Sequence, residues 1–148
     1  MNERTVLPPN PVALRLGYAG LIPFVLGTIL TWLVRDEAHV YAVRGLTNYA
    51  AVIVSFLGAI HWGLAFRQSI PSPSPYVWGV VPSLVAWVAS MMQPDAGLVV
   101  HGVMLIVCYL VDRRLYPAMG AGAWLTLRFR LSAVAALCCF LAAQATLF

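Results

Sequence analysis

The sequence predicts an all-α fold, a polytopic membrane helix bundle with five transmembrane helices. Of the 148 residues, 61% are hydrophobic and only 9% are charged, whereas a soluble domain carries about 25% charged residues. The uncharged runs are long enough to cross a bilayer, which takes about 20 residues in a helix. No polar block longer than about 15 residues interrupts them, which leaves no room for a soluble domain.

The predicted helices follow one another with short connections. We expect residues 1–15 to form a short cytoplasmic tail and residues 16–148 to form one membrane domain. The spans lie at about residues 16–34, 47–66, 76–92, 97–115 and 127–148. Pro23 in the first span and Pro82 in the third predict kinks, and neighbouring helices are expected to satisfy the carbonyl groups that a kink frees.

The positions of the arginines predict the orientation of the chain. All nine basic residues are arginine, and seven lie in the tail and in the second and fourth loops: Arg4, Arg15, Arg67, Arg113, Arg114, Arg128 and Arg130. The other side carries only Arg35 and Arg44. Because cytoplasmic loops are enriched in arginine, the N-terminus is predicted inside and the C-terminus outside. These arginines form no basic face with interleaved aromatic residues, which argues against nucleic acid as a partner.

Apart from the arginines assigned to the membrane boundaries, the ionisable side chains His61, His101 and Asp112 fall inside the predicted spans, where such groups are functional candidates. With a rise of about 1.5 Å per residue from the outer ends, His61 lies roughly 21 Å inward, Asp112 roughly 22 Å and His101 roughly 6 Å. His61 and Asp112 therefore share the inner leaflet on different helices. They are predicted to pin two spans together as a polar anchor, to handle protons or a ligand, or each to reach toward the nearby interface.

His61 and His101 are the candidates for binding a cofactor. Their depths differ by about 15 Å, so the two histidines of one chain are not expected to ligate one haem. The cysteines Cys108, Cys138 and Cys139 lie in apolar runs without zinc-ligand spacing, and they are expected to pack as small apolar side chains. No metal site and no resident cofactor are predicted, with haem or quinone binding kept as an alternative.

A stripe of small residues follows the second span at helical spacing. Ala51, Ser55, Gly58 or Ala59, and Trp62 follow one another by three or four positions, and Gly58 and Gly63 flank His61. Small residues let helices approach closely in lipid. The stripe predicts either tight packing within the bundle or a groove for a lipid-soluble ligand such as a quinone or a lipid.

The run Ser55-Phe-Leu-Gly-x-x-His-Trp-Gly63 resembles the centre of the family of small integral membrane proteins named domain of unknown function 3429. Supporting positions are Tyr49-Ala-Ala, Val81-Pro82, Trp87, Asp112 and Trp124-Leu-x-Leu-Arg128. The resemblance covers about residues 17 to 141. It implies a five-helix protein of bacterial inner membranes or mitochondria, and it supplies no activity and no established site residues.

The sequence contains no phosphate-binding loop, dinucleotide glycine pattern, metalloprotease motif or nucleophile elbow. We therefore expect no enzyme, and predict an accessory or assembly subunit that docks against a larger membrane complex, such as a respiratory one, in the bacterial inner membrane. A homo-oligomer is the other expected partner arrangement. One alternative is a small transporter that uses His61 and Asp112, and another is a haem- or quinone-binding membrane protein.

Overall fold

The computed structural model describes residues 8–70 and 72–147. All regular structure within these ranges is helical, with no strand, and this confirms the predicted all-α class. The elements are α1 (Pro11–Ala19), α2 (Ile22–Leu33), α3 (Asp36–Ala65), α4 (Ser74–Ser90), α5 (Pro94–Leu115), η1 (Gly122–Trp124), α6 (Leu125–Gln144) and η2 (Ala145–Leu147). Among the described residues, four segments are long and apolar enough to cross a membrane, with α1 and α2 counted as one. The 17 residues of α4 lie at the lower limit of about 17 for a span.

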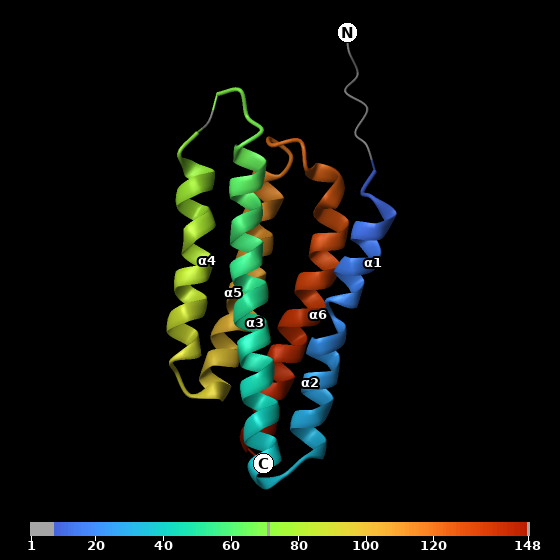
Figure 1. The fold of residues 1–148 in the computed structure, drawn as a ribbon, viewed down its shortest axis with the longest axis vertical. Coiled ribbons are helices and arrows are strands. Elements are labelled where there is room, and N and C mark those ends of the chain that lie inside the picture. Colours follow the sequence, from blue (N-terminus) through green and yellow to red (C-terminus); the bar gives the residue numbers. More distant parts are fainter. Residues whose placement is uncertain (1–7, 71, 148) are drawn as a thin grey trace.

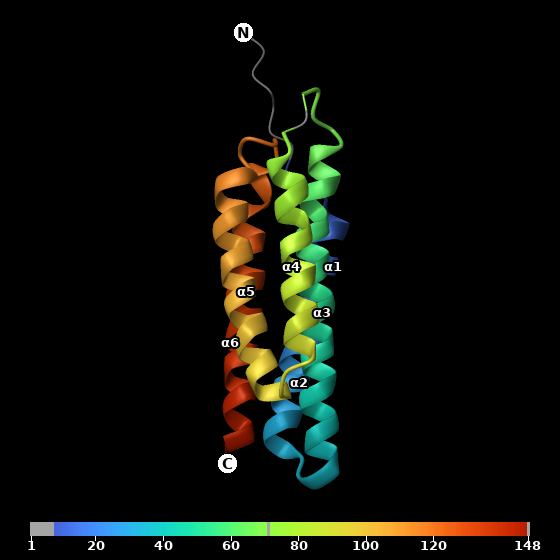
Figure 2. The same cartoon turned by 90° about the vertical axis from the view of Figure 1, so that its left-hand side faces the viewer.

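The five helical segments run alternately up and down, as the short predicted connections require (Figures 1 and 2). The start of α1, the connecting residues 66–70 and 72–73, and the connection at residues 116–124 lie at one end of the bundle, here called the loop end. The turns at residues 34–35 and 91–93 lie at the other, here called the turn end. Each helix that begins at one end therefore finishes at the other.

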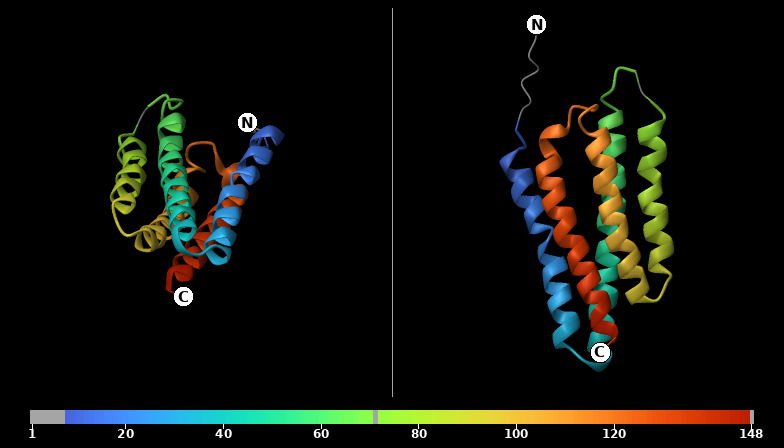
Figure 3. Two further views of the ribbon diagram at one scale, coloured as in Figure 1. Left: turned by 60° about the horizontal axis from the view of Figure 1, so that its bottom comes forward. Right: turned by 180° about the vertical axis from the view of Figure 1, so that it is seen from behind.

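The helices form two layers, and α3 is the middle helix of the first layer. Figure 3 shows α4, α3 and α2 side by side, with α5 and α6 behind them. α3 packs against α2, α4 and α5, so the second predicted span is the central helix of the bundle. Five fully buried residues from the facing helices mark the middle of the core: Ala50, Val54, Leu98, Leu105 and Cys139.

The first span bends between α1 and α2. Pro23 lies in the first turn of α2 and has no N–H group to bond the preceding turn. The carbonyl group of Gly20 lies in the bend, and the Tyr49 hydroxyl group of α3 donates a hydrogen bond to it at 2.8 Å. A neighbouring helix therefore satisfies a carbonyl group at the kink, as Pro23 predicts.

Tyr49→Phe is expected to lower the free energy of unfolding by about 1 kcal/mol, because the Gly20 carbonyl group loses its partner. The contact of this ring with Phe24, at 5.2 Å between centroids, would remain. Equilibrium unfolding by sodium dodecyl sulfate, followed by circular dichroism, measures the loss. Tyr41→Phe is the matched control, because Tyr41 lies on the same helix and is 76% exposed. Equal stabilities of the two variants would contradict the assignment.

Several helices begin earlier than the hydropathy predicts. α1 begins at Pro11 rather than near residue 16, and α3 begins at Asp36 rather than near residue 47. The 30 residues of α3 extend for about 45 Å, which exceeds the hydrocarbon thickness of about 30 Å. The helix therefore continues into polar sequence. The acidic residues in its first turn, Asp36 and Glu37, stabilise its N-terminus by interacting favourably with the helix dipole. Residues 1–7 of the predicted tail lie outside the described residues.

Candidate functional site

Three helices each bring one ionisable side chain to the same depth near the loop end. His61 lies one turn before the end of α3, and Asp112 lies one turn before the end of α5. Arg128 lies one turn after the start of α6. Since α3 and α5 run toward the loop end and α6 runs away from it (Figure 1), these positions are level.

The three side chains form a charge cluster centred on Asp112. His61 Nε2 lies 2.8 Å from Oδ1 of Asp112. Arg128 Nε donates to Oδ2 at 2.7 Å, and Arg128 Nη2 lies 2.6 Å from the same oxygen. His61 and Asp112 are fully buried, and Arg128 is 6% exposed. The pair expected from the depths of His61 and Asp112 is therefore in contact, and Arg128 joins it.

The hydrogen bonds define the protonation that fits this cluster. An ionised carboxylate only accepts hydrogen bonds, so the proton of His61 belongs on Nε2. Nδ1 of His61 has no partner, so a second proton there would place an N–H group and a positive charge in a buried site without an acceptor. With His61 neutral, the opposite charges of Asp112 and Arg128 balance one another.

Tyr116 covers the cluster at the loop end. It is 2% exposed and follows Asp112 by four residues, which places both on one helix face. Its ring centroid lies 5.7 Å from that of His61. Its hydroxyl group lies beside the Arg128 guanidinium without a well-aligned hydrogen bond. Sequence reasoning missed Tyr116, although its spacing from Asp112 could have indicated it.

The structure changes the interpretation of one predicted boundary residue. Arg128 was expected to mark the membrane boundary, but it is buried and paired with Asp112. Applying the depth argument to Arg128 could have found this, because it lies inside the last span. The other boundary arginines are exposed at the loop end: Arg67, Arg113, Arg114 and Arg130. The orientation of the bundle remains a prediction.

The small residues around His61 lie on two surfaces of α3. One surface packs against α4, and the other faces open space. At Gly58 an added Cβ would lie 2.5 Å from the Gly79 carbonyl oxygen of α4, so glycine permits this close approach. Trp62 Nε1 donates to the Tyr76 carbonyl group at 2.9 Å and also joins α4. Ser55 bonds the carbonyl group of its own helix at Ala51. At Gly63 an added Cβ would meet no atom within 4 Å, so the position of its Cβ is open space.

The structure keeps His101 away from the charge cluster. His101 is fully buried near the turn end, where it neighbours the backbone of Ala86 and Gly97. Its ring nitrogens have no well-aligned hydrogen bond. The eleven residues from His101 to Asp112 on one helix correspond to about 16 Å. Within the described ranges no group of three His, Cys, Asp or Glu side chains could hold a metal ion.

These features define a polytopic helix-bundle membrane protein with a buried charge cluster. The chain matches the family described as "Protein of unknown function (DUF3429)" over residues 9–144, and it belongs to that family. The family that the sequence resemblance predicts is thereby confirmed.

Two animal proteins are similar to the chain. Transmembrane protein 69 of Xenopus tropicalis is 34% identical over 116 residues, which cover 74% of this chain and 44% of that protein. Transmembrane protein 69 of Mus musculus is 33% identical over 88 residues, with 57% and 35% covered. The chain thus spans less than half the length of these relatives. No solved structure matches the chain.

Proposed function

We propose that the protein is a non-catalytic accessory or assembly subunit that docks against a larger complex in the bacterial inner membrane, such as a respiratory complex. The observation that carries the proposal is the position of α4 at one edge of the bundle (Figure 1). α4 packs mainly against α3, with a smaller contact to α5. Its outward face exposes large apolar side chains: Val77, Leu84, Trp87 and Val88.

The contact between α3 and α4 holds this face in a defined place. Gly58 and Gly79 bring the two backbones together, and the Pro82 ring packs at the same point. The hydrogen bond from Trp62 to the Tyr76 carbonyl group ties the loop end of both helices. Helices in lipid associate through close packing. A rigidly held apolar face therefore suits the docking of a neighbouring helix.

The charge cluster supports a packing role better than a transport path. Both carboxylate oxygens of Asp112 are engaged by His61 and Arg128. Between this cluster and His101, the facing positions of α5 are the buried Leu105 and Cys108. A carrier needs polar groups along its route, and this layer is apolar. Partner docking is therefore favoured over transport by His61 and Asp112.

A photo-crosslinking residue at position 84 tests the proposal in native membranes. Leu84 on α4 is 55% exposed, and Leu26 on α2, at the opposite edge, is 53% exposed and serves as the matched control. We expect the probe at Leu84, and not at Leu26, to crosslink one defined protein that copurifies in mild detergent at fixed stoichiometry. Mass spectrometry identifies the product. Crosslinks to further copies of this chain alone, or a monomer without crosslinks, would refute the docking proposal.

A further inference from the structure

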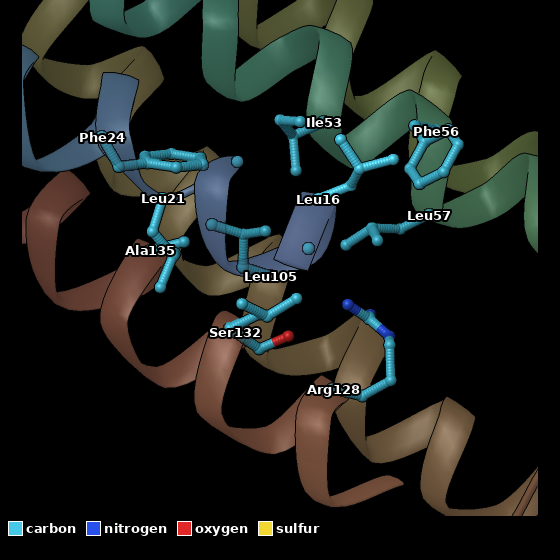
Figure 4. A pocket seen from close by; sticks show the side chains of 13 residues that line it. Leu16, Leu21, Phe24, Ile53, Phe56, Leu57, Leu105, Arg128, Ser132 and Ala135 are labelled. Atoms are coloured by element: carbon cyan, nitrogen blue, oxygen red, sulfur yellow. The ribbon is translucent and has the colours of Figure 1, made fainter. Parts of the chain in front are cut away.

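The bend between α1 and α2 leaves a pocket beside the charge cluster (Figure 4). Its volume is about 140 Å³. α6 forms its floor, and α3 and the α1–α2 bend form its walls. Its apolar lining includes Leu21, Phe24, Leu57 and Leu105. Leu16 and Phe56 also line it and are 68% and 60% exposed, so the pocket opens sideways toward the bilayer.

Ser132 supplies an unused hydrogen-bond donor to this pocket. Ser132 lines the pocket and is 3% exposed, and its Oγ has no hydrogen-bond partner among the described residues. The buried hydroxyl groups of Thr28, Thr31 and Thr47 all donate to carbonyl oxygens. A buried hydroxyl group without a partner is costly. The Ser132 hydroxyl is therefore available for a ligand that the chain itself does not contain.

Arg128 lines the same pocket and adds further donors. Figure 4 shows the Arg128 guanidinium and the Ser132 hydroxyl turned toward one another at the floor. A guanidinium carries five N–H donors, and Asp112 engages only Nε and Nη2. The floor of the pocket thus presents hydrogen-bond donors and no free acceptor oxygen from Asp112.

The charge balance indicates a neutral ligand. Asp112 already compensates the charge of Arg128. A ligand anion would add an unbalanced charge to an apolar site, which is costly. A neutral carbonyl oxygen accepts from Ser132 and Arg128 without that cost.

The size of the pocket indicates a single ring. An apolar cavity of about 150 Å³ lined by Leu, Ile and Phe takes up benzene, and this pocket is about 140 Å³. We propose that it binds the ring of a lipid-soluble quinone, with one ring carbonyl oxygen accepting from Ser132 Oγ and Arg128. The tail of the quinone leaves between Leu16 and Phe56. This inference does not depend on the docking of α4.

Binding of a decyl-substituted benzoquinone tests the proposal. The protein is placed in phosphatidylcholine nanodiscs, and the probe is titrated by isothermal calorimetry. We expect saturable binding, an affinity about fivefold lower in Ser132→Ala because one hydrogen bond is lost, and no saturable binding in Ser132→Leu, which fills the pocket. Ser83→Ala is the matched control, because the Ser83 hydroxyl bonds the carbonyl group of Val80 on α4, outside the pocket.

Two further measurements separate binding from folding and from lipid uptake. The melting temperature of Ser132→Ala should equal or exceed that of the parent protein, because the substitution removes a buried hydroxyl group without a partner. Methyl decanoate, a straight-chain ester with one carbonyl group, should bind more weakly than the quinone. Equal affinity for the ester would assign the pocket to a lipid ester and overturn the proposal. Absence of saturable quinone binding, or equal affinity of Ser132→Ala and the parent protein, would also overturn it.

Discussion

Asp112→Asn is expected to lower the free energy of unfolding by about 3 kcal/mol, because it leaves the buried Arg128 guanidinium without a counter-charge. The hydrogen bond from His61 would also lose its charged acceptor. The value lies at the lower end of the range for a broken buried pair, since Arg128 lies one turn from the loop end and can turn toward water. Equilibrium unfolding in mixed micelles measures the change.

Asp95→Asn is the matched control for this substitution. Asp95 lies in the first turn of the same helix, is half-buried and has no ion-pair partner in the described part of the chain. Its loss should cost less than about 1 kcal/mol, the value of a carboxylate at a helix N-terminus. The double variant Asp112→Asn/Arg128→Gln removes both charges, so its loss should be smaller than the sum of the two single losses by about 1–3 kcal/mol. Additive losses would show that the charge cluster contributes no coupling.

Gly58→Ala should lower the free energy of unfolding by about 2 kcal/mol, through overpacking between α3 and α4. The new Cβ would lie 2.5 Å from the Gly79 carbonyl oxygen and 3.1 Å from the Pro82 ring, so α4 must move outward. That displacement would weaken the hydrogen bond from Trp62 to the Tyr76 carbonyl group. A shift of the tryptophan fluorescence spectrum should therefore accompany the loss of stability.

Gly63→Ala places the same methyl group five residues later on the same helix. A Cβ at Gly63 meets no atom within 4 Å, and alanine favours a helix over glycine by about 0.8–1.0 kcal/mol. This variant should be as stable as the parent protein or more stable. If both alanine variants behaved alike, the close approach at Gly58 would be irrelevant to stability.

The sequence was sufficient to predict the class of protein, the number of helical segments and their up-and-down order. Hydropathy follows directly from composition along the chain, and a long uncharged run in lipid favours a helix because a helix satisfies its backbone groups within one segment. The depth of a residue in the membrane also follows from its position along its own helix, since every residue adds about 1.5 Å. That arithmetic placed His61 level with Asp112 and separated His101 from both. Helix ends were predicted less well, as α3 shows, because hydrogen bonding continues beyond the apolar residues.

What only the tertiary structure decided is which side chains face one another at a given depth. That choice depends on how each helix is rotated and tilted against its neighbours, and packing between distant segments sets both. Position along the chain places Arg128 at a membrane boundary, and only the packing of α6 beside α5 pairs it with Asp112. The same packing brings Arg128 and Ser132 to one pocket. The pocket they share lies at the bend, where α1 diverges from α3 while α2 stays packed against it. Pro23 predicts a kink in this span but not its direction.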